Sequence, residues 1–211
     1  MNRRSDSVIR FLLIVLVLGL YFKFTRTIFD FYLSDIKAGQ SKKLLLAADY
    51  VNSLQLAKEA VSLNPNEPYY YRLRAQSYLM NSLFLEEDSK DNLKKLALAD
   101  LKYSEKLNPK NLATLRNNLP FYYYLALDNF TQSTENSVFD EFYRSESERY
   151  LNYLKIIYPT DAGVLVSISH YEKLLNLVPA YEETLSIVKE LRPDLLDWHP
   201  LIVEWVSTGL P

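Results

Sequence analysis

The 211-residue chain contains no cysteine and only four glycines. Without cysteine there can be no disulfide, no thiolate nucleophile and no cysteine-based zinc site. So few glycines argue against turn-rich β-architectures and against glycine loops that cradle phosphate. The charges nearly balance, with 24 Lys and Arg against 26 Asp and Glu, so the chain has no general attraction to nucleic acid. Long helices are therefore expected, and DNA or RNA is not expected as a partner.

The sequence also lacks the motifs of common catalytic and metal sites. No GxSxG, Walker loop, GxGxxG or HExxH pattern occurs, and the only two histidines, His170 and His199, lie far apart. Adjacent acids such as Glu86 and Glu87 point to different sides of a helix, which does not suit a glycosidase pair. We therefore expect no enzyme activity, no cofactor and no metal ion.

A long apolar run stands near the N-terminus. No charge occurs from Phe11 to Phe22, and basic residues on either side extend the usable stretch to residues 8–24 by reaching the lipid headgroups. No small-x-small cleavage site follows. We predict a basic tail at residues 1–7 and an uncleaved single-pass membrane anchor at residues 8–26, with a helix buried against protein or a cleaved signal peptide as alternatives. More basic residues precede the run than follow it, which favours a cytoplasmic N-terminus and an outside repeat domain.

Aromatic residues cluster at the end of this run. They can form a belt at the membrane interface, or they can pack against the domain that follows. The cluster consists of Tyr21, Phe22, Phe24, Phe29, Phe31 and Tyr32.

Four helix-ending signals divide the remaining chain. In each, an apolar residue stands two places before a proline, which cannot continue a helix. The prolines are Pro65, Pro109, Pro159 and Pro193. Each is followed by a residue that can cap the next helix, and these are Asn66, Asn111, Asp161 and Asp194. The distance from Pro159 to Pro193 equals the tetratricopeptide period of about 34 residues.

Residues 68–109 resemble the tetratricopeptide family most closely. Tyr71, Ala75 and Tyr78 stand at the large, small and aromatic positions of the family's first helix. The second helix follows the family's small, large, small, apolar, proline order at Ala97, Leu101, Ser104, Leu107 and Pro109. The resemblance implies an all-α fold: an α-solenoid of about four helical hairpins after an N-terminal transmembrane helix. The repeat domain would occupy residues 27–211, with repeats at 34–65, 68–109, 112–159 and 162–193 and a closing helix at 199–208.

Three features depart from the family pattern. The polar stretches 81–92 and 128–140 are interpreted as loop insertions between the two helices of their hairpins. Pro120 is expected to kink or split the first helix of the third repeat. The last helix, counted from Tyr181, would be about one turn too short.

Runs of three tyrosines at 69–71 and 122–124 cannot all face one side of a helix. If Tyr71, Ala75 and Tyr78 are packed, the resemblance implies that another side of the first helices lines a concave groove. This side contains bases and phenols and no acid, which suits a carboxylate or a phosphate group. The alternative is a solvated helix face without a ligand. The candidate groove residues are Tyr69, Arg72, Gln76, Arg116, Tyr123, His170 and Lys173.

The sequence therefore predicts a single-pass membrane protein that acts as a tetratricopeptide-type scaffold and binds a protein or an acidic peptide segment without catalysis. The order of span and repeats also resembles the C-terminal tail of bacterial O-antigen ligase and polymerase-like membrane proteins. That resemblance implies an alternative, an accessory subunit of a membrane glycan-transfer system that recognises a carrier or a glycan. Neither the ligand nor the oligomeric state is predicted.

Overall fold

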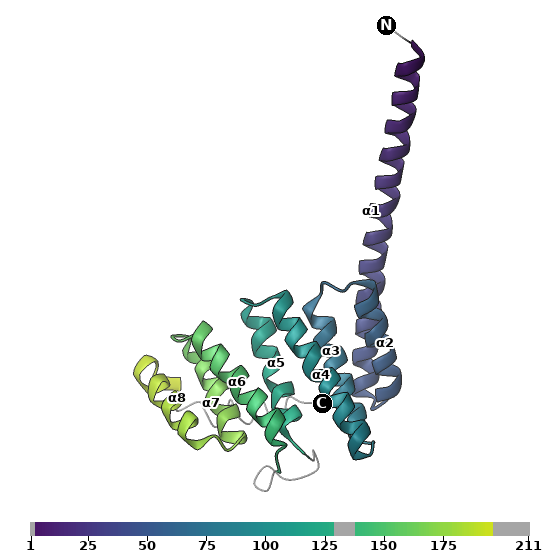
Figure 1. The fold of residues 1–211 in the computed structure, drawn as a ribbon. Helices are drawn as coiled ribbons and strands as arrows, with labels where there is room; N and C mark the ends of the chain where they lie inside the picture. The colour runs from purple at the N-terminus through teal and green to yellow at the C-terminus, as the bar shows by residue number, and fades with distance from the viewer. Residues whose placement is uncertain (1–2, 129–137, 196–211) are drawn as a thin grey trace.

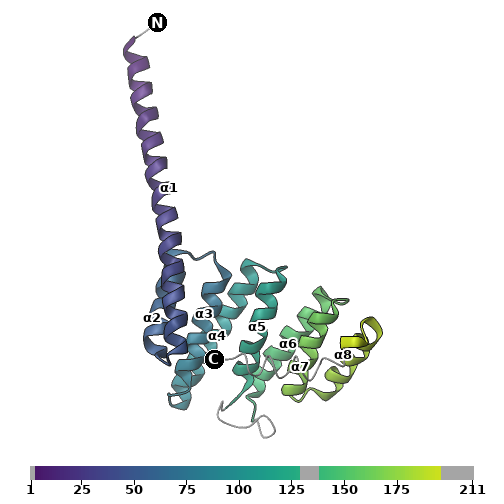
Figure 2. The same ribbon diagram turned by 180° about the vertical axis from the view of Figure 1, so that it is seen from behind.

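The computed structural model describes residues 3–128 and 138–195, with side chains from residue 11 onward, and this part of the chain is all-helical, as predicted. Each helix packs against the next, and α3 also contacts α1 and α5, while α5 contacts α7. The helices therefore lie in a row in chain order (Figures 1 and 2). The helices are α1 (Arg3–Leu46), α2 (Tyr50–Leu63), α3 (Pro68–Ser82), α4 (Glu87–Leu107), α5 (Leu112–Ala126), α6 (Glu141–Ile157), α7 (Ala162–Leu174) and α8 (Val178–Leu191). The closing helix predicted at residues 199–208 lies outside the described residues.

The first helix is the longest element, with 44 residues and a length of about 66 Å. Its N-terminal half projects away from the other helices (Figure 1). It is the one described helix that is long and apolar enough to cross a membrane. The aromatic cluster from Tyr21 to Tyr32 is exposed, so the alternative that it packs against the domain is wrong. The predicted anchor and the first helix of the domain form one continuous helix.

The C-terminal third of α1 belongs to the domain core. Ser34, Ala38, Ser41 and Leu45 recur at helical spacing and are buried. The hydroxyl of Ser41 lies 3.0 Å from that of Ser53 on α2, which lies 3.0 Å from that of Ser77 on α3. Because serine is small, these contacts let the three helices approach closely.

The packed face predicted for α3 is confirmed. Tyr71 and Tyr78 are buried, and Ala75 between them is 0% exposed. On the same helix Arg74 donates two hydrogen bonds, of 2.7 and 2.6 Å, to the carboxylate of Asp100 on α4. This bidentate pair fixes the register between the two helices.

Two of the predicted helix caps are confirmed. The side chain of Asn111 accepts a hydrogen bond from the Thr114 amide at 2.8 Å, and that of Asp161 accepts one from Val164 at 3.1 Å. The cap predicted at Asn66 is wrong, because Glu67 caps α3 instead.

The loop insertion predicted at residues 81–92 is also wrong. Helix α4 already begins at Glu87. Glu87 and Asp88 lie in its first turn, where the positive end of the helix dipole stabilises acidic side chains. Helix α5 continues through Pro120. Proline has no amide hydrogen, so the Arg116 carbonyl lacks its usual hydrogen bond within the helix. Arg116 lies on the exposed side, where water can bind this carbonyl instead. Helix α8 begins at Val178 rather than at Tyr181 and so has 14 residues, as many as α2.

Candidate functional site

Three of the predicted groove residues lie on α3. Tyr69, Arg72 and Gln76 are half-buried, and the Arg72 guanidinium lies 5.3 Å from the centre of the Tyr69 ring. This is a cation–π contact. Burial lowers the pKa of Arg72 from its usual value. A guanidinium keeps its proton in proteins, so the side chain stays charged. The structure thus brings the first two predicted residues together.

The remaining predicted residues lie on α5 and α7 and separate into two groups. Tyr123 is 8% exposed and His170 9% exposed, so neither presents an open surface. Both are near Tyr171, whose ring lies 6.1 Å from Tyr123 and 5.2 Å from His170. Arg116 and Lys173 are exposed. Of the predicted set, Arg72, Arg116 and Lys173 therefore supply the accessible positive charge, while the expectation that Tyr123 and His170 are open to a ligand is wrong.

A buried polar cluster, which we call the Glu105 cluster, joins α4, α5 and α6. The Tyr122 hydroxyl donates a hydrogen bond of 2.7 Å to the Glu105 carboxyl, and the Tyr122 ring stacks on Tyr150 at 4.1 Å between ring centres. Beside this carboxyl lies the fully buried amide of Asn118, which has no hydrogen-bond partner of good geometry. Burial raises the pKa of Glu105 to about 7. Sequence reasoning missed this cluster because Glu105 stands beside Lys106 in a charged helix segment, where nothing in the sequence signals burial.

Seven of the 17 tyrosines donate hydrogen bonds from their hydroxyls to other groups of the chain. Tyr150 and Tyr153 donate to the backbone carbonyls of Leu115 and Pro109 at 2.7 and 3.1 Å. Tyr70, Tyr71, Tyr122, Tyr143 and Tyr158 donate to other groups of the chain. These seven tyrosines therefore stabilise the packing of the domain, and their hydroxyls are not placed for the glycan recognition that the alternative function requires.

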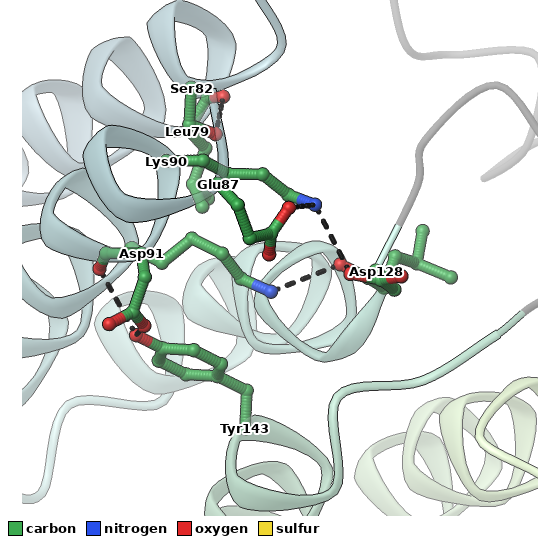
Figure 3. A network of polar contacts seen from close by, with 9 residues as sticks. Leu79, Ser82, Glu87, Lys90, Asp91, Asp128 and Tyr143 are labelled. Atoms are coloured by element: carbon green, nitrogen blue, oxygen red, sulfur yellow. Dashed lines mark hydrogen bonds and ion pairs between the residues drawn. The ribbon is translucent and has the colours of Figure 1, made fainter. Parts of the chain in front are cut away.

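A second polar network fixes the ends of the segment between α5 and α6 (Figure 3). Lys90 on α4 pairs with Asp128 at 3.1 Å, and the Tyr143 hydroxyl on α6 donates to Asp91 at 2.8 Å. Lys94, which is 2% exposed, donates to the Leu127 carbonyl at 3.1 Å. Burial lowers the pKa of Lys94. Because its amine is enclosed and bonded to the backbone, Lys94 clamps the end of α5 and is not placed to react with a substrate.

An apolar hollow of about 410 Å³ lies where the connection between α1 and α2 meets the connection between α3 and α4. Tyr50 and Phe84 stack across it at 5.7 Å between ring centres. Phe84 is 73% exposed, and Val51 beside it is 71% exposed. Exposed apolar surface of this kind is typical of sites that bind another protein. In the sequence, the two adjacent apolar residues Phe84 and Leu85 could have indicated this hollow, because they interrupt the otherwise polar stretch 81–92. The hollow is lined by Ala48, Asp49, Tyr50, Val51, Leu54, Asn81, Phe84, Leu85 and Leu93.

The described residues contain no group of three or more His, Asp or Glu side chains placed to hold a metal ion. No family model matches the chain, and no curated protein matches it. The function is therefore inferred from the arrangement of the side chains.

Proposed function

We propose that the chain is a membrane-anchored scaffold of the tetratricopeptide type, an α-solenoid of about four hairpins that binds a partner protein without catalysis. The continuity of α1 supports the proposal most directly, because one helix combines an exposed apolar segment from Phe11 to Phe22 with a C-terminal third buried among α2 and α3. An apolar half of this kind is stable in lipid and not in water. The domain is then joined to the membrane without a flexible linker.

The predicted anchor at residues 8–26 extends in this proposal to about Tyr32. Ile28, Phe29, Phe31 and Tyr32 are all exposed. Moving them into lipid contributes roughly 1.5 to 3 kcal/mol for each fully buried side chain. Lys23, Arg26 and Asp30 oppose this, because an ionised side chain costs roughly 2.5 to 3.5 kcal/mol at the centre of a span and less toward its ends. The two effects are of similar size, so the extension is favourable where these charges are paired, as Arg26 is with Asp30.

The proposed binding surface is the side of the domain that carries Arg72, Arg116 and Lys173. Arg72 is oriented over the Tyr69 ring, and the Lys173 amine lies 6.0 Å from the ring of Tyr181. Cations beside aromatic rings suit a partner that offers carboxylates along an extended segment. The apolar hollow near Phe84 supports a binding role as a second, separate surface.

The experiment is a pull-down with the detergent-solubilised full chain from membranes of its own cells. We expect Arg116→Glu, combined with Arg72→Glu, to reduce recovery of the specific partner about tenfold or more, because each reversal replaces attraction with repulsion. The matched control is Lys106→Glu, which reverses an exposed charge on α4. Circular dichroism confirms that the helical content is unchanged, and Arg116→Glu alone tests the surface without disturbing the half-buried Arg72. Unchanged recovery would remove this surface from the proposal.

Membrane attachment and orientation have their own tests. The full chain should stay in the membrane fraction after alkaline extraction, since the apolar residues from Phe11 to Phe22 favour insertion. Release into the soluble fraction would contradict the anchor. The proposed orientation has the N-terminus in the cytoplasm and the repeat domain outside, so protease added to intact cells should remove a C-terminal tag. Protection of the tag would reverse this orientation.

A further inference from the structure

The face of α1 that packs against the domain continues toward the N-terminus as a polar stripe. Residues three or four positions apart lie on one side of a helix. Counting back from buried Ser34 in such steps reaches Asp30, Thr27, Lys23 and Gly19. We call Gly19, Lys23, Thr27 and Asp30 the polar stripe. It faces the same side as the domain, and the helix runs through both parts without a break (Figure 2).

The opposite face of the same segment is apolar and aromatic. Tyr21, Ile28, Phe29 and Tyr32 lie on it, and each is exposed. Their side chains suit lipid and the membrane interface. The helix therefore presents one side to lipid and a different, polar side to the space next to the domain.

The charges of the stripe are unequal. Arg26, which flanks the stripe, lies 3.8 Å from Asp30 one turn away, so that acid already has a basic neighbour. The backbone carbonyl of Lys23 accepts a hydrogen bond from Thr27 at 3.0 Å, but among the described residues no carboxylate pairs with the Lys23 ammonium. One positive charge of the stripe is left without an opposite charge.

The depth of Lys23 makes this charge informative. The segment from Phe11 to Tyr32, in which exposed apolar residues predominate, is about 33 Å long, close to the roughly 30 Å of a bilayer's hydrocarbon core. Lys23 then lies about 14 Å from the Tyr32 end. Ionisable residues at such depths face protein or water and pair with an opposite charge.

We infer that the polar stripe binds a transmembrane helix of another protein, through a carboxylate on that helix that pairs with Lys23. The inference rests on the proposed membrane anchoring. A second copy of this chain fits poorly, because the same face would bring two Lys23 ammonium groups together and its only acid, Asp30, already lies beside Arg26. Since the stripe and the domain share one side of α1, the partner's helix lies directly above the domain.

The chain offers a matched pair of probe positions. It contains no native cysteine, so single cysteines can be placed without background labelling. Thr27 lies on the stripe and Thr25 on the far face, and each hydroxyl bonds a carbonyl four residues earlier, at 3.0 and 2.9 Å. Thr27→Cys and Thr25→Cys therefore disturb the helix equally. Each full-length variant is labelled with a benzophenone maleimide and irradiated in its native membranes, and the adducts are sequenced by mass spectrometry.

We expect position 27 to give an adduct that position 25 does not give, and its peptide to come from a membrane helix with Asp or Glu within about one turn of the attachment point. Adding Lys23→Leu should reduce this adduct about tenfold, while Lys23→Arg should retain it. Equal adducts at both positions, no adduct, adducts between two copies of this chain, or an adduct indifferent to Lys23→Leu would each overturn the inference. Alkaline extraction separates the two proposals: a released chain contradicts the anchor, while a retained chain without a face-specific adduct contradicts only the stripe.

Discussion

The Glu105 cluster makes stability depend on pH in a definite direction. Burial raises the pKa of Glu105 from 4.5 to about 7 in the folded chain, while the unfolded chain leaves this carboxyl in water with its ordinary value. The folded state therefore holds the proton more tightly. The stabilisation is complete below about pH 4.5, and it is lost as the pH rises through about 7.

The size of the effect follows from the two values. Each pKa unit corresponds to about 1.4 kcal/mol, so the interval from 4.5 to about 7 corresponds to roughly 3 kcal/mol. Between pH 5 and pH 8.5 the folded state should lose about 2 to 3 kcal/mol from this group. Basic neighbours moderate the shift, and the polar groups that act on the carboxyl are Tyr122, Asn118, Arg149 and Lys102.

The assay is urea unfolding of the full chain in a non-ionic detergent, followed by circular dichroism at both pH values. Glu105→Gln keeps an oxygen that can accept the Tyr122 hydroxyl and removes the titration, so most of the pH dependence should disappear. Glu148→Gln, at an exposed position on α6, should leave the pH dependence as it is. A wild-type free energy of unfolding that does not fall from pH 5 to pH 8.5, or a fall that persists in Glu105→Gln, would refute the reasoning.

Two further predictions concern the packing of α3 on α4, measured by the same unfolding assay. Arg74→Ala should lower the free energy of unfolding by about 3 to 5 kcal/mol, because it leaves Asp100 buried without its partner. The control Arg149→Ala removes an exposed ion pair and should lower it by less than about 1 kcal/mol. Losses of similar size in the two variants would contradict this account. Ala75→Leu should cost about 1 to 3 kcal/mol by overfilling a fully buried position, whereas Ala99→Leu at an exposed position should be nearly neutral.

The parts of the fold that sequence could predict are those governed by local chemistry. Prolines and capping residues act within one helical turn, which is why the caps at Asn111 and Asp161 could be assigned. The buried positions Ala75 and Leu101 could be identified because helical periodicity places apolar and small residues on one side. These signals need no knowledge of distant parts of the chain.

The errors arose where a residue's environment depends on another helix. Tyr123 and His170 occupy positions that helical rotation alone would leave open, and they are buried because α5 packs against α7 around Tyr171. The polar stretch 81–92 predicts a loop, although its acids stabilise the start of α4 and Lys90 pairs with Asp128 beyond α5. A polar side chain faces either solvent or a polar group on another helix, and only the folded structure shows which of the two applies.

The composition of the N-terminal run also does not show how the run is joined to the domain. The continuity of α1 answers this question. A separate anchor followed by a linker would leave the domain free to rotate beneath the membrane. Because α1 is uninterrupted and Ser34 and Ser41 are already buried against the domain, a rotation of the anchor must turn the domain with it. Each residue of a helix turns the direction of its side chain by about 100°. The positions of Lys23 on α1 and Arg72 on α3 relative to each other are therefore set by the continuous helix and by the packing of α3 against it, so the proposed partner helix and the proposed acidic segment would be held in one fixed geometry.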